Sequence, residues 1–581
     1  MSAKVKFWHG MGVRLGLMLI FVVVLTAFYV VQTQAKATVV SSQIVDIERI
    51  SVGTNGVQAD GSSFFAFTSV DNRYITFHSW ASNISTDQTG ENWLDVFLRD
   101  RQTNTTIKIT NGIDGPTNED SFDAVLTADG RYVVYTSYAW NLVPNDTNRD
   151  AWSRNGLDIF LYDTQTQQTQ RVSLAHDGKE IQGNSSGIIS RDGTWILMDS
   201  DGPGILPSST PAGSNLYLRN WRTGEIKLLV AGGENGYFTS WWPDYDASHA
   251  AFSSTFDHLA ANDTNGEQDV FWVDASTGVI TLVSRSINGG SANGKSGQSV
   301  ISQDGRYVVF VSYASDLIPN DTNGVGDVFI YDRITDSIER VSVSSSGEQA
   351  NGLSRDPSIC GNGRYVSFSS DATNLVANDT NGKRDVFVHD MQSGETFVAS
   401  VNSSGEQTNG KVHRSYLTFD CRYITYASDG TNIVPNDTNN ARDLFMGRIY
   451  RQPDFSGSSA VLTPAQPGGT TTFRSTIVNN GTDSATADLW VPIPANTSLI
   501  VSSLPLGAVY NASQNRVEWQ GSVAGESEFV FTFDLVVDSG LVDFTLLTTD
   551  ATLTGDGQTR TLHGVTAVNG IPVFLPVIAN E

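Results

Sequence analysis

The sequence predicts an all-β protein: a seven-bladed β-propeller, whose last blade is completed by an N-terminal strand, followed by an Ig-like β-sandwich. Three observations lead to this prediction. A unit with a typical length of 58 residues recurs through most of the chain. Each unit contains short runs of β-branched and aromatic residues separated by Asp-Gly, Asn-Gly or Thr-Gly turns, which is the pattern of antiparallel hairpins. After residue 450 the repeat stops, and apolar and polar residues alternate.

The repeat is clearest between Ile301 and Ser342, where the turn at Asp304-Gly305 gives a reference point. We call the first residue of this turn the reference residue of its unit. The seven reference residues are Asp71, Asp129, Asp192, Asp246, Asp304, Asn362 and Asp420. Their spacings are 58, 63, 54, 58, 58 and 58 residues. Because four antiparallel strands make one propeller blade, seven such units predict seven blades.

The last unit lacks the fourth strand that the other units have. It reaches Asp443-Leu444-Phe445 and stops, whereas the fifth unit continues to a fourth strand at 339–342. A spare copy of that strand, Glu48-Arg49-Ile50-Ser51, precedes the first reference residue. An unpaired strand edge is a liability for a sheet. We therefore expect residues 48–51 to complete the seventh blade.

The repeated pattern DGRYV, NDTNG, DVF, TG and RVS resembles the WD40-like PD40 repeat of the TolB-type propeller families, over roughly residues 44–450. This resemblance implies the propeller fold, which serves binding, scaffolding and catalysis alike. Residues 458–566 resemble the DUF11-type Ig-like domains of bacterial surface proteins. The matching segments are 467–487, 491–499 and 517–535. That second resemblance implies a spacer or adhesive module.

The N-terminus has the pattern of a secretory signal. Lys4, Lys6 and Arg14 precede the apolar run Leu15–Val31, and Ala35-Lys36-Ala37 offers a cleavage site. An uncleaved anchor is the alternative, and in either case we expect the protein to be secreted or at the cell surface, with membrane contact only through this segment. The predicted organisation is signal or anchor 1–37, propeller 38–450, linker 451–457, sandwich 458–566 and apolar tail 567–581.

Composition excludes some functions. The formal net charge of −26 argues against nucleic acid as a partner, because nucleic acid requires a basic face. Cys360 and Cys421 lie beside equivalent turns of two units, and the sequence leaves open whether they form a disulfide or remain free thiols. No motif for a catalytic centre stands out, so no catalytic residue is assigned.

The strongest chemical motif is D-x-N-x-x-x-D in the long loop of four units. Carboxylate and amide oxygens at these positions are ligands that Ca²⁺ prefers. The alternative is that they cap the loop through hydrogen bonds to the backbone, without a metal. The candidate Ca²⁺ ligands are Asp263, Asn265, Asp269, Asp321, Asn323, Asp327, Asp379, Asn381, Asp385, Asp437, Asn439 and Asp443. A looser version runs from Asp87 to Asp95, and an interrupted one joins Asp146 and Asn148 to Asp158.

Tryptophans provide a second candidate site. Trp80, Trp93, Trp140 and Trp152 lie in or beside the long loops of the first two units, and Trp241 and Trp242 adjoin the inner strand of the fourth. Exposed tryptophans bind sugar rings or protein partners, whereas buried ones pack between blades. We therefore expect a non-catalytic surface protein that binds a protein or glycan, with Ca²⁺ as a candidate stabiliser. The alternatives are a secreted carbohydrate-active lyase or hydrolase, and a purely structural module.

Overall fold

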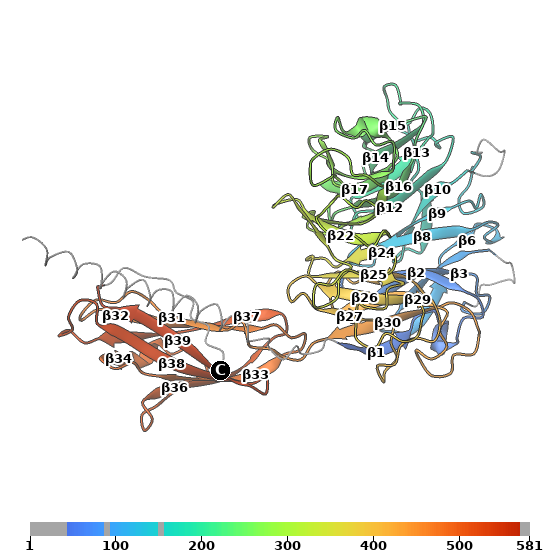
Figure 1. Cartoon of the computed structure of the whole chain (residues 1–581). Coiled ribbons are helices and arrows are strands. Elements are labelled where there is room, and N and C mark those ends of the chain that lie inside the picture. The colour runs from blue at the N-terminus through green and yellow to red at the C-terminus, as the bar shows by residue number, and fades with distance from the viewer. Residues whose placement is uncertain (1–42, 86–92, 149–155, 570–581) are drawn as a thin grey trace, which may run out of the picture. The chain divides into compact units, whose positions relative to one another are not determined.

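The computed structural model describes residues 43–85, 93–148 and 156–569. Across these ranges the chain is all-β and divides into two compact units, one of residues 43–449 and one that begins at Tyr450 (Figure 1). Among the residues described, helix is confined to three short 3-10 turns, η1 (Thr54–Gly56), η2 (Asp257–Leu259) and η3 (Val501–Ser503). None of the helices in these ranges is long and apolar enough to cross a membrane.

The first unit consists of short antiparallel strands in chain order. They are β1 (Gln43–Arg49), β2 (Ser63–Thr68), β3 (Tyr74–Ser79), β4 (Asp95–Asp100), β5 (Thr105–Lys108), β6 (Asn111–Gly112), β7 (Gly115–Pro116), β8 (Ser121–Leu126), β9 (Tyr132–Ser137), β10 (Asp158–Asp163), β11 (Gln168–Arg171), β12 (Ser185–Ile189), β13 (Trp195–Ser200), β14 (Ser214–Asn220), β15 (Ile226–Gly233), β16 (Phe238–Pro243), β17 (His249–Ser254), β18 (Asp269–Asp274), β19 (Ile280–Leu282), β20 (Ser296–Ile301), β21 (Tyr307–Ser312), β22 (Asp327–Asp332), β23 (Ser337–Arg340), β24 (Ser354–Ile359), β25 (Tyr365–Ser370), β26 (Asp385–Asp390), β27 (Thr396–Val398), β28 (Val412–Leu417), β29 (Tyr423–Ser428) and β30 (Asp443–Tyr450).

Apart from β6 and β7, which pair with each other, these strands form four-stranded sheets, an arrangement consistent with a β-propeller. Within the described ranges of this unit there are seven such sheets: β2–β5, β8–β11, β12–β15, β16–β19, β20–β23, β24–β27, and β28–β30 with β1. The middle strands are buried on both faces, because neighbouring sheets cover them. In β21 and in β22 every residue is buried except the one at an end of the strand, which is partly exposed. Aromatic pairs recur across these middle strands, as between Phe310 and Phe329, whose ring centroids are 5.8 Å apart.

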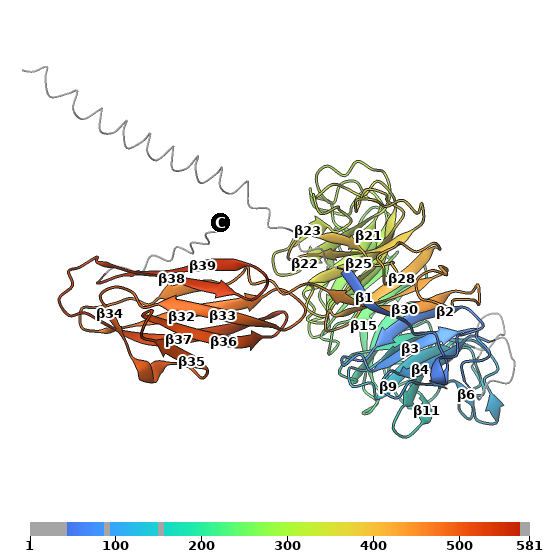
Figure 2. The ribbon, with the colours of Figure 1, turned by 90° about the horizontal axis from the view of Figure 1, so that it is seen from below.

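The N-terminal strand pairs with the last repeat, as the sequence predicts. β1 lies beside β30 in the sheet of β28 and β29 (Figures 1 and 2). It covers Gln43–Arg49, and so begins several residues before the predicted 48–51. The pairing continues past the strand, since the Ile50 amide donates to the Leu444 carbonyl at 2.8 Å. The Ser51 hydroxyl then donates to Asp443 Oδ1 at 2.6 Å.

The tight turns at five of the seven reference residues share one hydrogen-bond pattern, in which a serine or threonine hydroxyl lies two positions before the reference residue. In the fifth unit, Ser302 Oγ donates to Asp304 Oδ1 at 2.5 Å and accepts the Tyr307 amide at 2.9 Å. The next residue, Gly305, has a φ of 69°, the left-handed region that glycine adopts without strain. Backbone bonds also join turns of neighbouring units, as from the Val70 amide to the Ala128 carbonyl at 2.9 Å. The repeated turn residues therefore stabilise their own hairpin and also bind it to the turn of the neighbouring unit.

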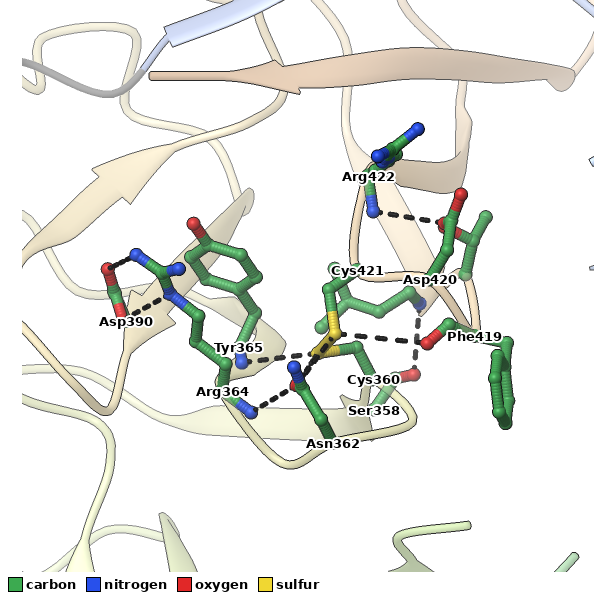
Figure 3. The surroundings of a disulfide bond; sticks show 12 residues. Ser358, Cys360, Asn362, Arg364, Tyr365, Asp390, Phe419, Asp420, Cys421 and Arg422 are labelled. Atoms are coloured by element: carbon green, nitrogen blue, oxygen red, sulfur yellow. Dashed lines mark hydrogen bonds and ion pairs between the residues drawn. A yellow bond between two sulfur atoms is a disulfide. The ribbon is translucent and has the colours of Figure 1, made fainter. Parts of the chain in front are cut away.

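A disulfide joins the turns of the sixth and seventh units, which settles the alternative left open by the sequence (Figure 3). Cys360 occupies the place of Ser302, and its sulfur accepts the Tyr365 amide at 3.3 Å. Cys421 occupies the place of Gly305 and has a φ of 60°. The bridge thus links the sheet of β24–β27 covalently to the sheet that β1 completes.

The second unit has two antiparallel sheets around one hydrophobic core, and Figure 2 shows its long strands side by side. Phe473 and Phe533 from one sheet and Leu489 from the other are fully or almost fully buried in that core. Phe455 is buried there too, so the predicted linker 451–457 contributes to this unit. The strands are β31 (Ser459–Leu462), β32 (Thr470–Asn479), β33 (Ala485–Pro492), β34 (Thr497–Leu499), β35 (Ala508–Asn511), β36 (Arg516–Val523), β37 (Ser527–Val537), β38 (Leu546–Thr554) and β39 (Thr559–Ala567).

Several sequence predictions fall outside the described residues. They are the signal or anchor 1–37, Asp87, Trp152 and the tail from residue 570 onward.

Candidate functional site

The first strand of nearly every sheet in the first unit carries a β-bulge. Its register with the second strand shifts in six of the seven sheets of the described residues, for example between Gly297 and Val300. The bulge residue Gln298 has a φ of 54°, and Asp356 in the next unit has a φ of 52°. A bulge bends its strand and redirects a side chain, and bulges are common beside functional sites. The repeated bulges therefore indicate a functional site at these first strands.

The bulges surround a cavity of about 500 Å³. In every unit the residue six positions before the reference residue lines this cavity, and we call these seven residues the inner ring. The inner ring consists of Phe65, Asp123, Ser186, Ser240, Gln298, Asp356 and Arg414. The turn residues are nearly the same in all units, whereas the inner ring contains an aromatic, acidic, basic and uncharged polar residues. Repetition therefore preserves the scaffold while the inner ring varies, as expected for a binding surface on a rigid fold.

Aromatic rings form the floor of the cavity. Phe67 lies 4.3 Å from Tyr416 and 5.4 Å from Trp242, measured between ring centroids. The same three residues also line a small cavity of about 60 Å³ that contains Arg191. Arg191 donates to the carbonyl of Thr68 at 2.9 Å, and burial lowers its pKa to about 10. The floor separates the large cavity from the tight turns, so a ligand would enter from the side of the long loops.

Polar groups on the cavity wall are held in place by one another. Arg414 Nε donates to Asp356 Oδ1 at 3.2 Å, and its guanidinium lies 5.1 Å from the ring centroid of Phe65. Gln298 accepts the Asp356 amide at 2.9 Å. Burial raises the pKa of Asp123, and the nearby charge of Arg414 opposes that shift. The wall thus offers fixed donors and acceptors beside aromatic faces, an arrangement that orients a polar ligand.

Comparing the repeats could have found the inner ring from the sequence, because its seven residues share one offset from the reference residue. Three of the four tryptophans that were predicted as ligand contacts lie elsewhere. Trp80 is 51% exposed, Trp140 is 53% exposed and Trp93 is half-buried, and none of the three lines the cavity. Trp241 and Trp242, by contrast, are part of its wall and floor.

The predicted calcium loops enclose a basic side chain in two of the four clear cases. Asp321 and Asp327 lie 3.3 and 3.4 Å from the Arg340 guanidinium. Gln349 Nε2 donates to the same two carboxylates at 2.8 and 2.9 Å. In the last unit Arg49 lies 3.2 Å from both Asp437 and Asp443. A guanidinium here supplies the positive charge that a metal ion would otherwise bring.

The two less regular loops also contain a cation. Lys108 Nζ lies 2.7 Å from Asp95 Oδ2 in the first unit. In the second unit Asp146, Asp158 and Glu180 are close enough together to hold a metal ion, but Arg171 lies 2.9 Å from Asp146. The clear loops at Asp263–Asp269 and Asp379–Asp385 differ, since Leu282 and Val398 stand where the others carry Arg or Lys.

Acid is expected to destabilise the first unit through His78, which packs against the inner ring. His78 is 3% exposed and its ring centroid is 4.9 Å from that of Phe65. Burial lowers its pKa to about 3, so its contribution to stability is complete above the unfolded pKa near 6.5 and is lost as pH falls toward 3. A change from pH 7 to pH 4.5 should lower the unfolding free energy of the wild type by about 2 kcal/mol more than that of the His78→Val variant.

Urea unfolding at the two pH values measures this difference. Valine is the matched substitution, because Val311 occupies the equivalent place in the fifth unit. Equal losses for both proteins would contradict the assignment of a neutral, buried His78.

Comparisons with known proteins found matches among solved structures. No family model matches the chain, and no curated protein matches it. Similar solved structures include an oligogalacturonate lyase in complex with manganese, at 12% identity over 70% of this chain and 98% of that chain, with a TM-score of 0.41. They also include a putative TolB from Agrobacterium tumefaciens, at 15% identity over 60% and 96%, with a TM-score of 0.31.

The WD40 repeats of RRP9 are similar at 11% identity over 70% of this chain and all of that chain, with a TM-score of 0.38. The structures similar to this chain thus include TolB-like and WD40 β-propeller proteins. At these identities and TM-scores, no activity of theirs is carried over to this chain.

Proposed function

We propose that the first unit is a seven-bladed propeller that acts as a non-catalytic binding protein and takes the end of a glycan into its central cavity. The observation that carries this proposal is the inner ring, where seven repeats present five kinds of side chain to one cavity of about 500 Å³. A ligand-sized concave site with a few fixed polar groups is typical of small-molecule recognition rather than of a flat protein interface.

The chemistry of the wall favours a polyhydroxylated ligand. Sugar hydroxyls both donate and accept hydrogen bonds, and the cavity offers donors at Arg414 and acceptors at Asp356 close together. Sugar rings also have an apolar face, for which Phe65, Trp241 and Trp242 provide aromatic partners. A purely apolar ligand would displace water from this charged pair without offering hydrogen bonds in return, which costs binding free energy.

Catalysis is the second candidate function, and one observation favours it. Asp123 is a carboxyl group with a raised pKa in the cavity, where the Arg414 charge acts on it. A carboxyl group with a raised pKa beside a bound glycan has one property of a general acid. This alternative makes the chain a carbohydrate-active lyase or hydrolase, and product formation from a bound glycan distinguishes it from simple binding.

We propose that the second unit is an Ig-like, DUF11-type module that serves as a spacer or adhesive domain. Its two sheets around one core support this. We also propose export to the cell surface or the medium, with the N-terminal segment as signal or anchor, on the basis of its charge and hydropathy pattern.

A glycan array probed with the full chain, followed by calorimetric titration of each glycan that binds, tests the proposed function. Gln298→Ala and Phe65→Ala should each weaken binding by about tenfold, because a hydrogen bond or an aromatic contact is lost. Trp140→Ala removes an exposed aromatic outside the cavity and is the matched control, with affinity unchanged. An array without binding, or equal losses for Trp140→Ala and the cavity variants, would contradict the proposal.

A further inference from the structure

The long loop of the fourth unit repeats the side-chain hydrogen bonds of the fifth. Asn265 Nδ2 donates to Asp269 Oδ2 at 2.9 Å and to the Ala292 carbonyl at 3.0 Å. Asn323 makes the same two bonds, to Asp327 and Ala350, at the same two distances. The serine hydroxyl that caps the second aspartate is also repeated, at 2.6 Å in both loops. The carboxylate pairs of the two loops are therefore equivalent.

The groups that neutralise this pair in the fifth unit are absent from the fourth. Arg340 pairs with Phe329 across the sheet, and the residue paired with the equivalent Phe271 is Leu282. Gln349 forms a bridge with Val343, and its equivalent, bridged to Arg285, is Ser291. Both the guanidinium and the amide that contact the carboxylates of the fifth unit are thus replaced by side chains that do not reach the pair.

The first aspartate of the fourth loop is left without a partner. Asp263 is 5% exposed, and neither of its carboxylate oxygens has a hydrogen-bond partner. Asp269 is fully buried, so the loop holds two acidic side chains away from water. A buried carboxylate pair without a compensating cation is unfavourable, and each of the other loops of this kind, apart from the one at Asp379, carries Arg or Lys.

We infer that the loop of Asp263 and Asp269 binds one divalent metal ion of the calcium class, at the position that Arg340 fills in the fifth unit. Asp263 would contribute both carboxylate oxygens and Asp269 would contribute Oδ2, with water completing the coordination. A site with oxygen ligands alone suits Ca²⁺ better than a transition metal. This narrows the calcium prediction from four loops to one, and it does not depend on the glycan proposal.

The loop at Asp379 is intermediate and is not included. Val398 replaces the arginine there, but Gln407 is retained and donates to Asp379 Oδ1 at 3.2 Å. Asp379 is only half-buried, so water reaches it more easily than it reaches Asp263. In the loop at Asp379 the arginine is absent, but the glutamine still donates a hydrogen bond to the carboxylate pair. In the fourth unit both the arginine and the glutamine are absent.

Calorimetric titration of chelator-stripped full-length protein with CaCl₂, in buffer containing NaCl, tests the inference. The wild type should bind Ca²⁺ with a dissociation constant of about 0.1–1 mM, the range of extracellular calcium modules. The Leu282→Arg/Ser291→Gln variant restores the arrangement of the fifth unit, and it should bind one Ca²⁺ fewer than the wild type. Its melting temperature should not change between 10 mM CaCl₂ and chelator, whereas that of the wild type should rise in CaCl₂.

Two further variants keep the test decisive if the double variant folds poorly. Asp263→Asn removes one charge and should weaken Ca²⁺ binding at least tenfold. Arg340→Leu/Gln349→Ser copies the fourth loop into the fifth unit and should add one Ca²⁺ site. An absence of heat together with equal melting temperatures in CaCl₂ and chelator would overturn the inference, since a proton shared by the two carboxyls would then neutralise the pair. Undiminished binding by Asp263→Asn would also overturn it.

Discussion

Deleting residues 44–53 should unfold most of the first unit at temperatures at which the intact protein is native. The deletion removes β1, one of the four strands of the last sheet, and leaves the edge of β30 unpaired. It also removes Arg49, the cation between Asp437 and Asp443, both of which are almost fully buried side chains. Breaking a buried ion pair from one side costs about 3–5 kcal/mol by itself. Differential scanning calorimetry should show a fall in melting temperature of more than about 10 °C.

The Arg49→Leu variant distinguishes the contribution of the Arg49 charge to stability from that of the β1 strand. It keeps the backbone pairing of β1 and removes only the guanidinium, so we expect a loss of about 3–5 kcal/mol, less than that of the deletion. The control is Arg448→Leu, which removes an exposed ion pair with Asp46 on the same two strands and should cost less than about 1 kcal/mol. An unchanged melting temperature after deletion of residues 44–53 would contradict the role of β1 in closing the unit.

Removing the disulfide should also destabilise the protein strongly. Cys360→Ser/Cys421→Gly gives both turns the residues of the fifth unit and opens a covalent loop with a sequence separation of 61. The chain-entropy estimate for a loop of this length is about 4 kcal/mol. Glycine at the left-handed position of Cys421 returns about 1 kcal/mol, because its φ of 60° strains a residue with a side chain. The net loss should be about 3 kcal/mol.

Guanidinium unfolding with and without a reductant measures this loss. The wild type should lose stability when reduced, whereas the variant should be unaffected by the reductant. Equal stability of the wild type and the variant in the absence of reductant would show that the bridge does not constrain the folded protein.

Local chemistry explains which features could be predicted from the sequence. The turns at Asp304 and its equivalents recur with strands on both sides, so the sheets and their order follow from spacing and β-propensity. Glu48-Arg49-Ile50-Ser51 could be assigned because it copies the fourth strand that the last unit lacks. The start of β1 at Gln43 could not, because its first residues depart from the repeat and form a strand through pairing with β30.

The cavity and the ion pairs were missed for a different reason. Phe65 and Arg414 are far apart in sequence and meet only because every first strand faces the centre of the unit. Similarly, the loop motif at Asp321 is visible as a metal-ligand pattern, but Arg340 reaches it from the following hairpin. Arg49 reaches Asp437 from the other end of the chain. Such partners depend on tertiary structure, which spacing within one loop does not reveal.

The most direct test of the central claim is a crystal structure of the full chain soaked with a glycan identified on the array. We predict electron density for the glycan within the inner ring, against Phe65 and Trp242 and within hydrogen-bond distance of Arg414 or Asp356. Density confined to the exposed tryptophans Trp80 and Trp140, with the cavity containing only water, would contradict the account.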